Sequence, residues 1–275
     1  MDKLTIYCMS LQNSHLDKIK SLNYIPTGLN NDNFSKEWVR DNTGDNISYK
    51  NSYYGEYTFY YWYWKNILKF KKNDEWVGFC SYREYWGNNL NNKGKNLRDL
   101  VLQKFCPNWS NYDAVIGKPI HVGKKMKLMK VIKYGKMALI RNPKAIIFEK
   151  GRTIRWQFEM FHGIKKLDKA IDLLPEQDRE DFRNFTRTEN SFSRGNMFIT
   201  KSSKIMNEYF EYVFNWLTKC EGIFGFNLEG YGQIRMYTFL AERFLPFWFK
   251  KYTKSIEWPV IYHDINKDEK INKKQ

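Results

Sequence analysis

The sequence lacks any apolar run that approaches the ~20 residues needed to cross a bilayer. Its first residues, MDKLTIYCMSLQNS, hold only a short apolar stretch and no small-residue cleavage site, so they do not resemble a signal peptide. We therefore expect a cytoplasmic protein.

Metal-binding patterns are also missing. The four cysteines and four histidines are widely scattered, with no CxxC pair and no histidine spacing that suits a metal ion. A structural zinc site is therefore not expected, and the thiols are predicted to be reduced and mostly buried.

The usual phosphate-binding motifs do not occur. There is no GxGxxG, no GxxxxGK[ST], no serine nucleophile elbow and no DxD pair, the nearest acids being Asp41 and Asp45. Any phosphate would have to be held by arginine, lysine, backbone N–H groups or aromatic hydroxyls. No cofactor is indicated, and a divalent ion (Mn²⁺ or Mg²⁺) stays open although the DxD motif is missing.

Positive charge is plentiful. The formal net charge is +16, and residues 118–155 hold twelve basic residues against the single acid Glu149, which gives +11 in that segment. Such a run can be a solvated face, a surface for anionic lipids or a surface for nucleic acid phosphates.

Aromatic residues are concentrated in one segment, NISYKNSYYGEYTFYYWYWKN (residues 46–66), around the single acid Glu56. An aromatic run of this kind can be core, a base-stacking platform, a membrane-interface belt or a sugar-binding wall. Glu56, Lys65 and Arg83 lie in aromatic surroundings, where charge is costly unless it is paired or used.

Periodicity predicts an α/β fold. Strands are expected at residues 4–10, 76–80, 112–120 and 194–200, with a basic strand pair at 131–151. Helices are expected at residues 53–68, 153–174, from Pro175 onward, at 202–220 with a serine N-cap, and at 232–252, kinked or ended near Pro246. Residues 81–83 follow the 76–80 strand at its carboxyl end, where open α/β sheets bind ligands.

The block DNTGDNISYKNSYYGEYTFYYWYWKN, followed by WVGFCSYREYW, resembles a bacterial family of capsular and exopolysaccharide glycosyltransferases (DUF4422-type), grouped with the GT-A enzymes. YDAVI, FHGIKKLDKAIDLL, NMFIT and GQIRMYTFLAERFL resemble later segments of that family. The chain departs from it at residues 81–84, which read Ser-Tyr-Arg-Glu where the family has His-Tyr-Arg-Arg.

The resemblance implies a GT-A-like, nucleotide-binding Rossmann-type sheet with a helical C-terminal half. It implies one domain over residues 1–265, a basic insertion at about 118–155 and a disordered basic tail at 266–275. The implied activity is transfer of a sugar, from a UDP-linked hexose or galactofuranose donor, to a growing bacterial surface glycan (capsule, lipooligosaccharide or exopolysaccharide). The acceptor would be a glycan or lipid-linked oligosaccharide at the anionic inner face of the cytoplasmic membrane, with no nucleic acid partner.

Site residues are expected in two groups. For the base that activates the acceptor hydroxyl, the candidates are Glu242, His162 and Glu229, of which the first two match the family. The expected donor-binding residues are Asp41, Asp45, Asn46, Asn51, Tyr54, Glu56, Trp64, Lys65, Asn66, Ser81, Tyr82, Arg83 and Arg235. Arg83 is the first candidate for the phosphate, with Lys65 and Arg235 next.

Two other functions stay open on sequence grounds. A nucleic-acid-binding protein could use the basic and aromatic residues for phosphates and base stacking. A non-catalytic relative acting as an assembly partner is the other alternative, because Ser81 and Glu84 replace two residues of the family pattern.

Overall fold

The computed structural model describes residues 3–30, 33–71, 75–88, 96–122, 140, 145, 148, 151–266 and 272–273. In these parts a mixed sheet runs in the order β10-β6-β9-β4-β1-β2-β3, which confirms the expected α/β class. Its strands are β1 (Lys3–Ser10), β2 (Ile25–Gly28), β3 (Val39–Arg40), β4 (Glu75–Ser81), β5 (Glu84–Trp86), β6 (Ala114–Gly117), β9 (Phe198–Thr200), β10 (Ser255–Trp258), β11 (Val260–Tyr262) and β12 (Asn272–Lys273). A second, two-stranded sheet pairs β7 (Ile120–His121) with β8 (Ser191–Phe192).

Four neighbouring strands, β3, β2, β1 and β4, are parallel, so their carboxyl ends meet at one edge of the sheet. The register places Met9 beside Ser81 and Ser10 beside Gly28. The strands predicted at residues 4–10 and 76–80 are confirmed, and β4 is buried along most of its length, as its apolar run indicates.

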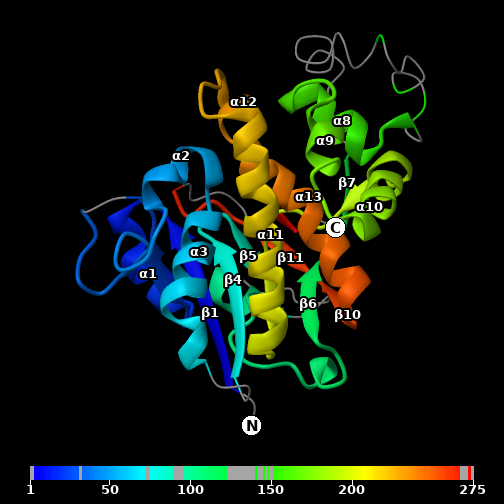
Figure 1. Ribbon diagram of the computed structural model, residues 1–275. Coiled ribbons are helices and arrows are strands. Elements are labelled where there is room, and N and C mark those ends of the chain that lie inside the picture. Colours follow the sequence, from blue (N-terminus) through cyan, green and yellow to red (C-terminus); the bar gives the residue numbers. More distant parts are fainter. Residues whose placement is uncertain are drawn as a thin grey trace.

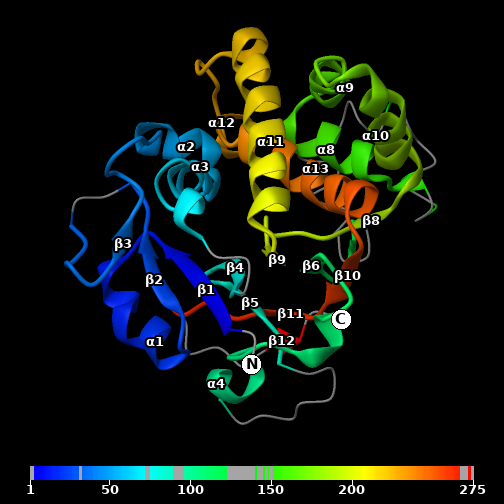
Figure 2. The same cartoon turned by 60° about the horizontal axis from the view of Figure 1, so that its bottom comes forward.

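Helices cover both faces of the sheet (Figures 1 and 2). They are α1 (Leu16–Ser21), α2 (Asn51–Tyr54), α3 (Tyr57–Asn66), α4 (Leu97–Leu100), α8 (Ile154–His162), α9 (Lys166–Ile171), α10 (Glu176–Thr188), α11 (Ser203–Phe224), α12 (Tyr231–Ile234) and α13 (Met236–Tyr252). Short 3₁₀ turns occupy Asn13–His15, Ser48–Lys50, Leu68–Phe70 and Pro107–Trp109. In Figure 2, α2, α3, α11 and α13 lie above the sheet, and α1 and α4 lie below it.

Several predicted boundaries were wrong. The single helix expected at residues 53–68 is divided at Gly55, whose φ of +54° lies in the left-handed region and ends α2. The helix expected at 153–174 breaks after α8 at Gly163. Residues 232–252 form α12 and α13, and α13 continues through Pro246. The expected strand at 112–120 is shorter, as β6.

The serine N-cap predicted for the helix at 202–220 is present, whereas two other predicted segments are largely outside the described residues. Ser202 is the N-cap of α11, because its side chain accepts a hydrogen bond from the Ile205 N–H at 3.2 Å. Most of the basic strand pair expected at 131–151 and most of the tail at 266–275 lie outside the described residues, and of the pair's described residues Ile140 and Ala145 are helical rather than in strands. Within the described part of the chain, no helix is long and apolar enough to cross a membrane.

Most of the aromatic run is core. Tyr57, Phe59, Tyr60, Trp62 and Tyr63 are all buried on α3, within a cluster that also includes α11 and α13. The core interpretation is therefore confirmed for this stretch of α3. A second cluster fills the space between the opposite face of the sheet and helices α1 and α4.

Candidate functional site

The carboxyl end of β4 turns sharply at Ser81, Tyr82 and Arg83, and this turn is fixed from both sides. The Tyr82 N–H donates to the Met9 carbonyl of β1 at 3.0 Å. From the C-terminal segment, the N–H groups of His263 and Ile265 donate to the carbonyls of Arg83 and Tyr82 at 3.0 and 3.4 Å. The turn is thus held between the first strand and the segment that follows β11.

The Tyr82 side chain is also held in place. Its ring lies 5.0 Å from the ring of His15, and the Arg83 guanidinium lies 4.9 Å from its centroid. His15 donates from Nε2 to Asn266 Oδ1 at 2.8 Å, and its Nδ1 forms a hydrogen bond with the Ser10 hydroxyl at 2.8 Å. These contacts orient the exposed Arg83 side chain at the edge of the sheet.

The electrostatic surroundings of Arg83 keep it charged. Partial burial alone would lower the pKa of Arg83, but the nearby hydroxyls of Tyr82 and Tyr262, the Asp264 carboxylate and the Tyr231 hydroxyl raise it. The pKa of Tyr82 is raised, mainly by burial, and the carboxylates of Asp264 and Glu56 raise it further against the lowering effect of Arg83.

A second guanidinium lies close by. Arg235 Nη2 is 3.6 Å from Glu56 Oε2, and the Arg235 guanidinium lies 5.7 Å from the centroid of the Tyr231 ring. The Tyr231 hydroxyl raises the pKa of Arg83, and the Glu56 carboxylate raises that of Tyr82, so the Arg235–Glu56 pair lies within electrostatic range of the turn at Ser81–Arg83. Two cations, tyrosine hydroxyls and a carboxylate therefore gather at the carboxyl edge of the sheet, which suits an anionic ligand that also carries hydroxyls.

A polar chain leads from this edge into the protein. The Thr238 hydroxyl on α13 donates to Glu56 Oε2 at 3.3 Å and accepts from Asn196 Nδ2 at 3.1 Å. Asn196 precedes β9 and is buried, as is Thr238. The loop before β9 thus belongs to the site.

Other expected donor-binding residues form contacts that fix neighbouring loops. Asp41 is buried and accepts from the Asn30 N–H at 3.0 Å and the Thr58 hydroxyl at 2.5 Å. Burial raises the pKa of Asp41. Asn51 Nδ2 donates to the Gly55 carbonyl and the Thr58 hydroxyl, each at 3.0 Å. These side chains hold the segment between β3 and α3.

Residues 45, 46 and 66 are bonded locally as well. Asn66 donates from Nδ2 to the Asp45 carbonyl and accepts from the Asp45 N–H, at 2.8 and 3.2 Å. Asn46 donates to the Gly44 carbonyl and accepts from the Ser48 hydroxyl, both at 2.9 Å. Their amides therefore close the turn that leads into the 3₁₀ helix at Ser48–Lys50.

The remaining aromatic candidates contact α11 rather than the sheet edge. The Tyr54 hydroxyl donates to Glu221 Oε1 at 2.6 Å. Trp64 stacks on Phe214 with ring centroids 5.7 Å apart, and the Lys65 ammonium lies 3.4 Å from the Trp64 ring centroid. Lys65 is thus placed on the helix surface, away from the pair of arginines.

Glu242, a candidate base, has both carboxylate oxygens engaged. Oε1 accepts from the Gly195 N–H at 3.0 Å, and Oε2 contacts Arg243 Nη1 at 2.6 Å. Arg243 is buried, and burial lowers its pKa to about 10 against the raising effect of Glu242. This geometry ties the loop before β9 to α13.

His162, the second candidate base, is buried and neutral. Its Nδ1 donates to the Gly232 carbonyl at 2.7 Å, and its ring stacks on Phe239 at 4.2 Å. Burial lowers the pKa of His162 to about 3, and the charges of Arg243 and Lys166 lower it further. The side chain joins α8 to α12.

This lowered pKa predicts acid sensitivity. An unfolded histidine binds a proton below pH ~6.5, whereas folded His162 does not until about pH 3, so the free energy of unfolding falls as the pH drops through that window. We expect a slope of about 1.4 kcal/mol per pH unit from this residue, which His162→Gln should remove. Urea unfolding of both proteins between pH 7.5 and 4 measures it, and an unchanged slope would contradict the assignment.

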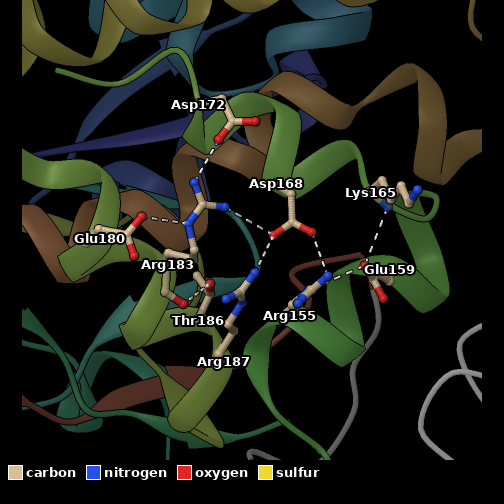
Figure 3. A network of polar contacts seen from close by, with 9 residues as sticks. All are labelled: Arg155, Glu159, Lys165, Asp168, Asp172, Glu180, Arg183, Thr186 and Arg187. Carbon is tan, nitrogen blue, oxygen red and sulfur yellow. Dashed lines mark hydrogen bonds and ion pairs between the residues drawn. The ribbon is translucent and has the colours of Figure 1, made fainter. Parts of the chain in front are cut away.

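An ion network holds the helix that carries His162 (Figure 3). Asp168 of α9 contacts Arg155 at 2.5 Å, Arg183 at 3.6 Å and Arg187 at 3.7 Å, which joins α8, α9 and α10. Arg155 belongs to the basic segment, and Arg152 donates to the Ala145 carbonyl at 2.8 Å. Both of these charges therefore have contacts inside the protein.

The third candidate base, Glu229, is exposed in the loop before α12.

A divalent ion at the carboxyl end of β4 would meet Ser81, Tyr82, Arg83 and Glu84. This set offers one carboxylate, and the residue before it carries a guanidinium group. Among the described residues, no three histidine, cysteine, aspartate or glutamate side chains come together to hold a metal ion. This donor set does not fit a divalent metal.

Five residues at the site were missed in the sequence: His15, Asn196, Tyr231, Asp264 and Asn266. Tyr231 carried a usable signal, since it lies beside the family-matching segment at 232–245. Asn196 carried one as well, as the first residue of the family-resembling segment NMFIT. His15, Asp264 and Asn266 reach the site through contacts with distant parts of the chain, which local patterns do not encode.

Comparisons with known proteins agree with this architecture. Among solved structures, the chain is similar to the apo form of the WbbM bifunctional glycosyltransferase, with a TM-score of 0.67 and 19% sequence identity. The similarity covers 94% of this chain but 45% of that protein, so this chain spans less than half of its length. The expected likeness to a glycosyltransferase fold is thereby confirmed.

No curated protein matches the chain. A protein-family comparison matches residues 5–254 to the family described as "Domain of unknown function (DUF4422)". Because the match covers most of the chain, the protein belongs to the DUF4422 family.

Proposed function

We propose that this protein is a glycosyltransferase that moves a sugar from a nucleotide-linked donor to a glycan. The observation that carries the proposal is the Arg235–Glu56 ion pair near the turn at Ser81–Arg83, at the carboxyl end of β4; Tyr231 contacts Arg235 and also raises the pKa of Arg83. Ligands of open α/β sheets bind at this edge. The likeness to the WbbM fold supports the same reaction class.

In the proposed reaction, the guanidinium groups of Arg83 and Arg235 stabilise the negative charge that develops on the departing diphosphate. Glu56 binds hydroxyls of the donor sugar. Of the three base candidates, Glu229 is the one with an exposed carboxylate. Glu242 is engaged by Gly195 and Arg243, and His162 is buried with its pKa lowered to about 3. Glu229 is therefore the proposed base for the acceptor hydroxyl.

The narrower proposal is hexosyl transfer from a UDP-linked hexose or galactofuranose to a growing bacterial surface glycan. It follows the family resemblance. The formal net charge of +16 supports work at the anionic inner face of the cytoplasmic membrane on a lipid-linked acceptor.

Thermal shift with UDP-, GDP-, CMP- and dTDP-sugars, with and without Mn²⁺, tests the proposal. A ligand that binds only the folded state adds about 2.7 kcal/mol at a hundredfold excess over its Kd. One nucleotide class is expected to raise the Tm. Arg83→Ala should weaken its binding by about ten- to a hundredfold, because a charge-assisted hydrogen bond contributes about 1.5–3 kcal/mol.

Arg98→Ala is the matched control, since Arg98 is exposed on α4. This helix covers the face of the sheet opposite to α3 and α11 (Figure 2). It should leave the nucleotide-induced shift unchanged. The proposal would be overturned if no nucleotide sugar raised the Tm while oligonucleotides bound in a salt-sensitive manner, which is the behaviour of the nucleic-acid-binding alternative.

A further inference from the structure

Asn196 has a buried hydrogen-bond acceptor without a donor. The residue is 6% exposed, and among the described residues no group donates to its Oδ1. Its side-chain Nδ2 donates to the Thr238 hydroxyl at 3.1 Å, and its carbonyl accepts from the Tyr60 hydroxyl. Buried acceptors are nearly always paired in native proteins, so this oxygen points to a missing donor.

The backbone of Asn196 is also unusual. Its φ of +53° lies in the left-handed region, which a residue with a side chain adopts at a cost. The preceding Gly195, with φ of +90°, is held by Glu242 through its N–H at 3.0 Å. The protein thus holds a strained residue in a defined position immediately before β9.

Asn196 is the buried end of the polar chain described above. Thr238 links it to Glu56, and Glu56 contacts Arg235. The side chains of Glu56 and Arg235 are 25% and 21% exposed, so these two form the end of the chain that faces solvent.

The contacts between these residues are loose. Thr238 is 3.3 Å from Glu56 and Arg235 is 3.6 Å from it, both longer than the usual ~2.7–2.9 Å of a charge-assisted hydrogen bond. A ligand that attracts the Arg235 guanidinium, such as a phosphate, can therefore draw it from Glu56 at small cost.

We propose that Asn196 is a specificity-determining residue, which binds one hydroxyl of the donor sugar together with Glu56. This inference rests on the proposed function. The sugar hydroxyl donates to Asn196 Oδ1, and Glu56 accepts from a neighbouring hydroxyl once Arg235 pairs with the donor diphosphate. Asn196 Oδ1 is then paired only if the sugar has a hydroxyl at the right position and in the right orientation. Sugars that lack this hydroxyl, or carry it in the other orientation, should bind more weakly.

The experiment compares the affinity for UDP-hexoses with that for UDP by calorimetry. Asn196→Gly removes the amide, while glycine suits the left-handed φ. The matched control is Asn23→Gly, since Asn23 has a φ of +59° and is exposed in the turn before β2. For the UDP-hexose that binds wild type best, the affinity advantage over UDP is expected to fall at least tenfold in Asn196→Gly. It should be unchanged in Asn23→Gly.

A second measurement varies the ligand. Among monodeoxy forms of the best UDP-hexose, one is expected to bind wild type at least tenfold more weakly, and the same form should cause no further loss in Asn196→Gly. An unchanged advantage in Asn196→Gly, or no single hydroxyl that matters to wild type, overturns the inference while leaving the proposed function intact. If neither UDP nor any UDP-hexose bound wild type, both the role of Asn196 and the proposed function would be overturned for UDP-linked donors.

Discussion

Glu242→Ala is expected to destabilise the protein by about 3–5 kcal/mol, because it leaves the buried Arg243 guanidinium without its partner charge. Arg243 is 3% exposed, and its other hydrogen bonds go to the Phe239 carbonyl at 3.1 Å and to Gln157 Oε1 at 2.9 Å, both uncharged acceptors. The change also removes the acceptor of the Gly195 N–H. Urea unfolding at pH 7.5 measures the loss.

A double variant separates the buried charge from the other effects. Glu242→Ala combined with Arg243→Met removes both charges, and it should be more stable than Glu242→Ala alone, because an apolar side chain among Phe158, Phe192 and Phe239 needs no ion partner. If Glu242→Ala unfolded like wild type yet lost transferase activity, the catalytic role expected from the sequence would hold instead.

The second large effect is expected for Phe79→Ala, at about 3–5 kcal/mol. Phe79 lies on β4 with no exposed surface, and its ring contacts those of Tyr7, Phe59, Tyr60, Tyr63, Phe198 and Phe210. Truncation leaves a cavity between the sheet and helices α3 and α11, which rigid rings cannot fill. Thermal and urea unfolding provide the measurement.

Tyr49→Ala is the control within the aromatic segment. Tyr49 is 72% exposed, so its removal should change the free energy of unfolding by about 0.5 kcal/mol or less. Equal effects of the two substitutions would mean that the aromatic segment does not pack as a core.

Local patterns predicted the central strands well for a physical reason. A parallel strand buried on both faces needs an uninterrupted apolar run, and residues 76–80 supply one. The position of Ser81–Arg83 at the ligand-binding edge followed from that strand alone. By contrast, the division of the aromatic helix depends on the left-handed φ of Gly55, which periodicity does not reveal.

The composition of the site was harder to predict, because its contacts join distant positions. Glu56 and Thr238 are separated by 182 positions, and His15 and Asn266 by 251. The family resemblance marks shared residues without distinguishing their tasks. Asp41 and Asn51 fix loops, whereas Arg83 lies at the sheet edge.

The C-terminal segment has a consequence for the order of assembly on the ribosome. The family match ends at residue 254, yet β10, β11 and Asn266 follow it and secure the turn at Tyr82 and Arg83. During synthesis, the turn at Ser81–Arg83 emerges more than 170 residues before the segment that fixes it. The aromatic core needs α13, which ends at Tyr252, so the core can be completed shortly before the segment that fixes the turn is synthesised. The turn at Ser81–Arg83 is therefore expected to be secured only after the core has its last helix.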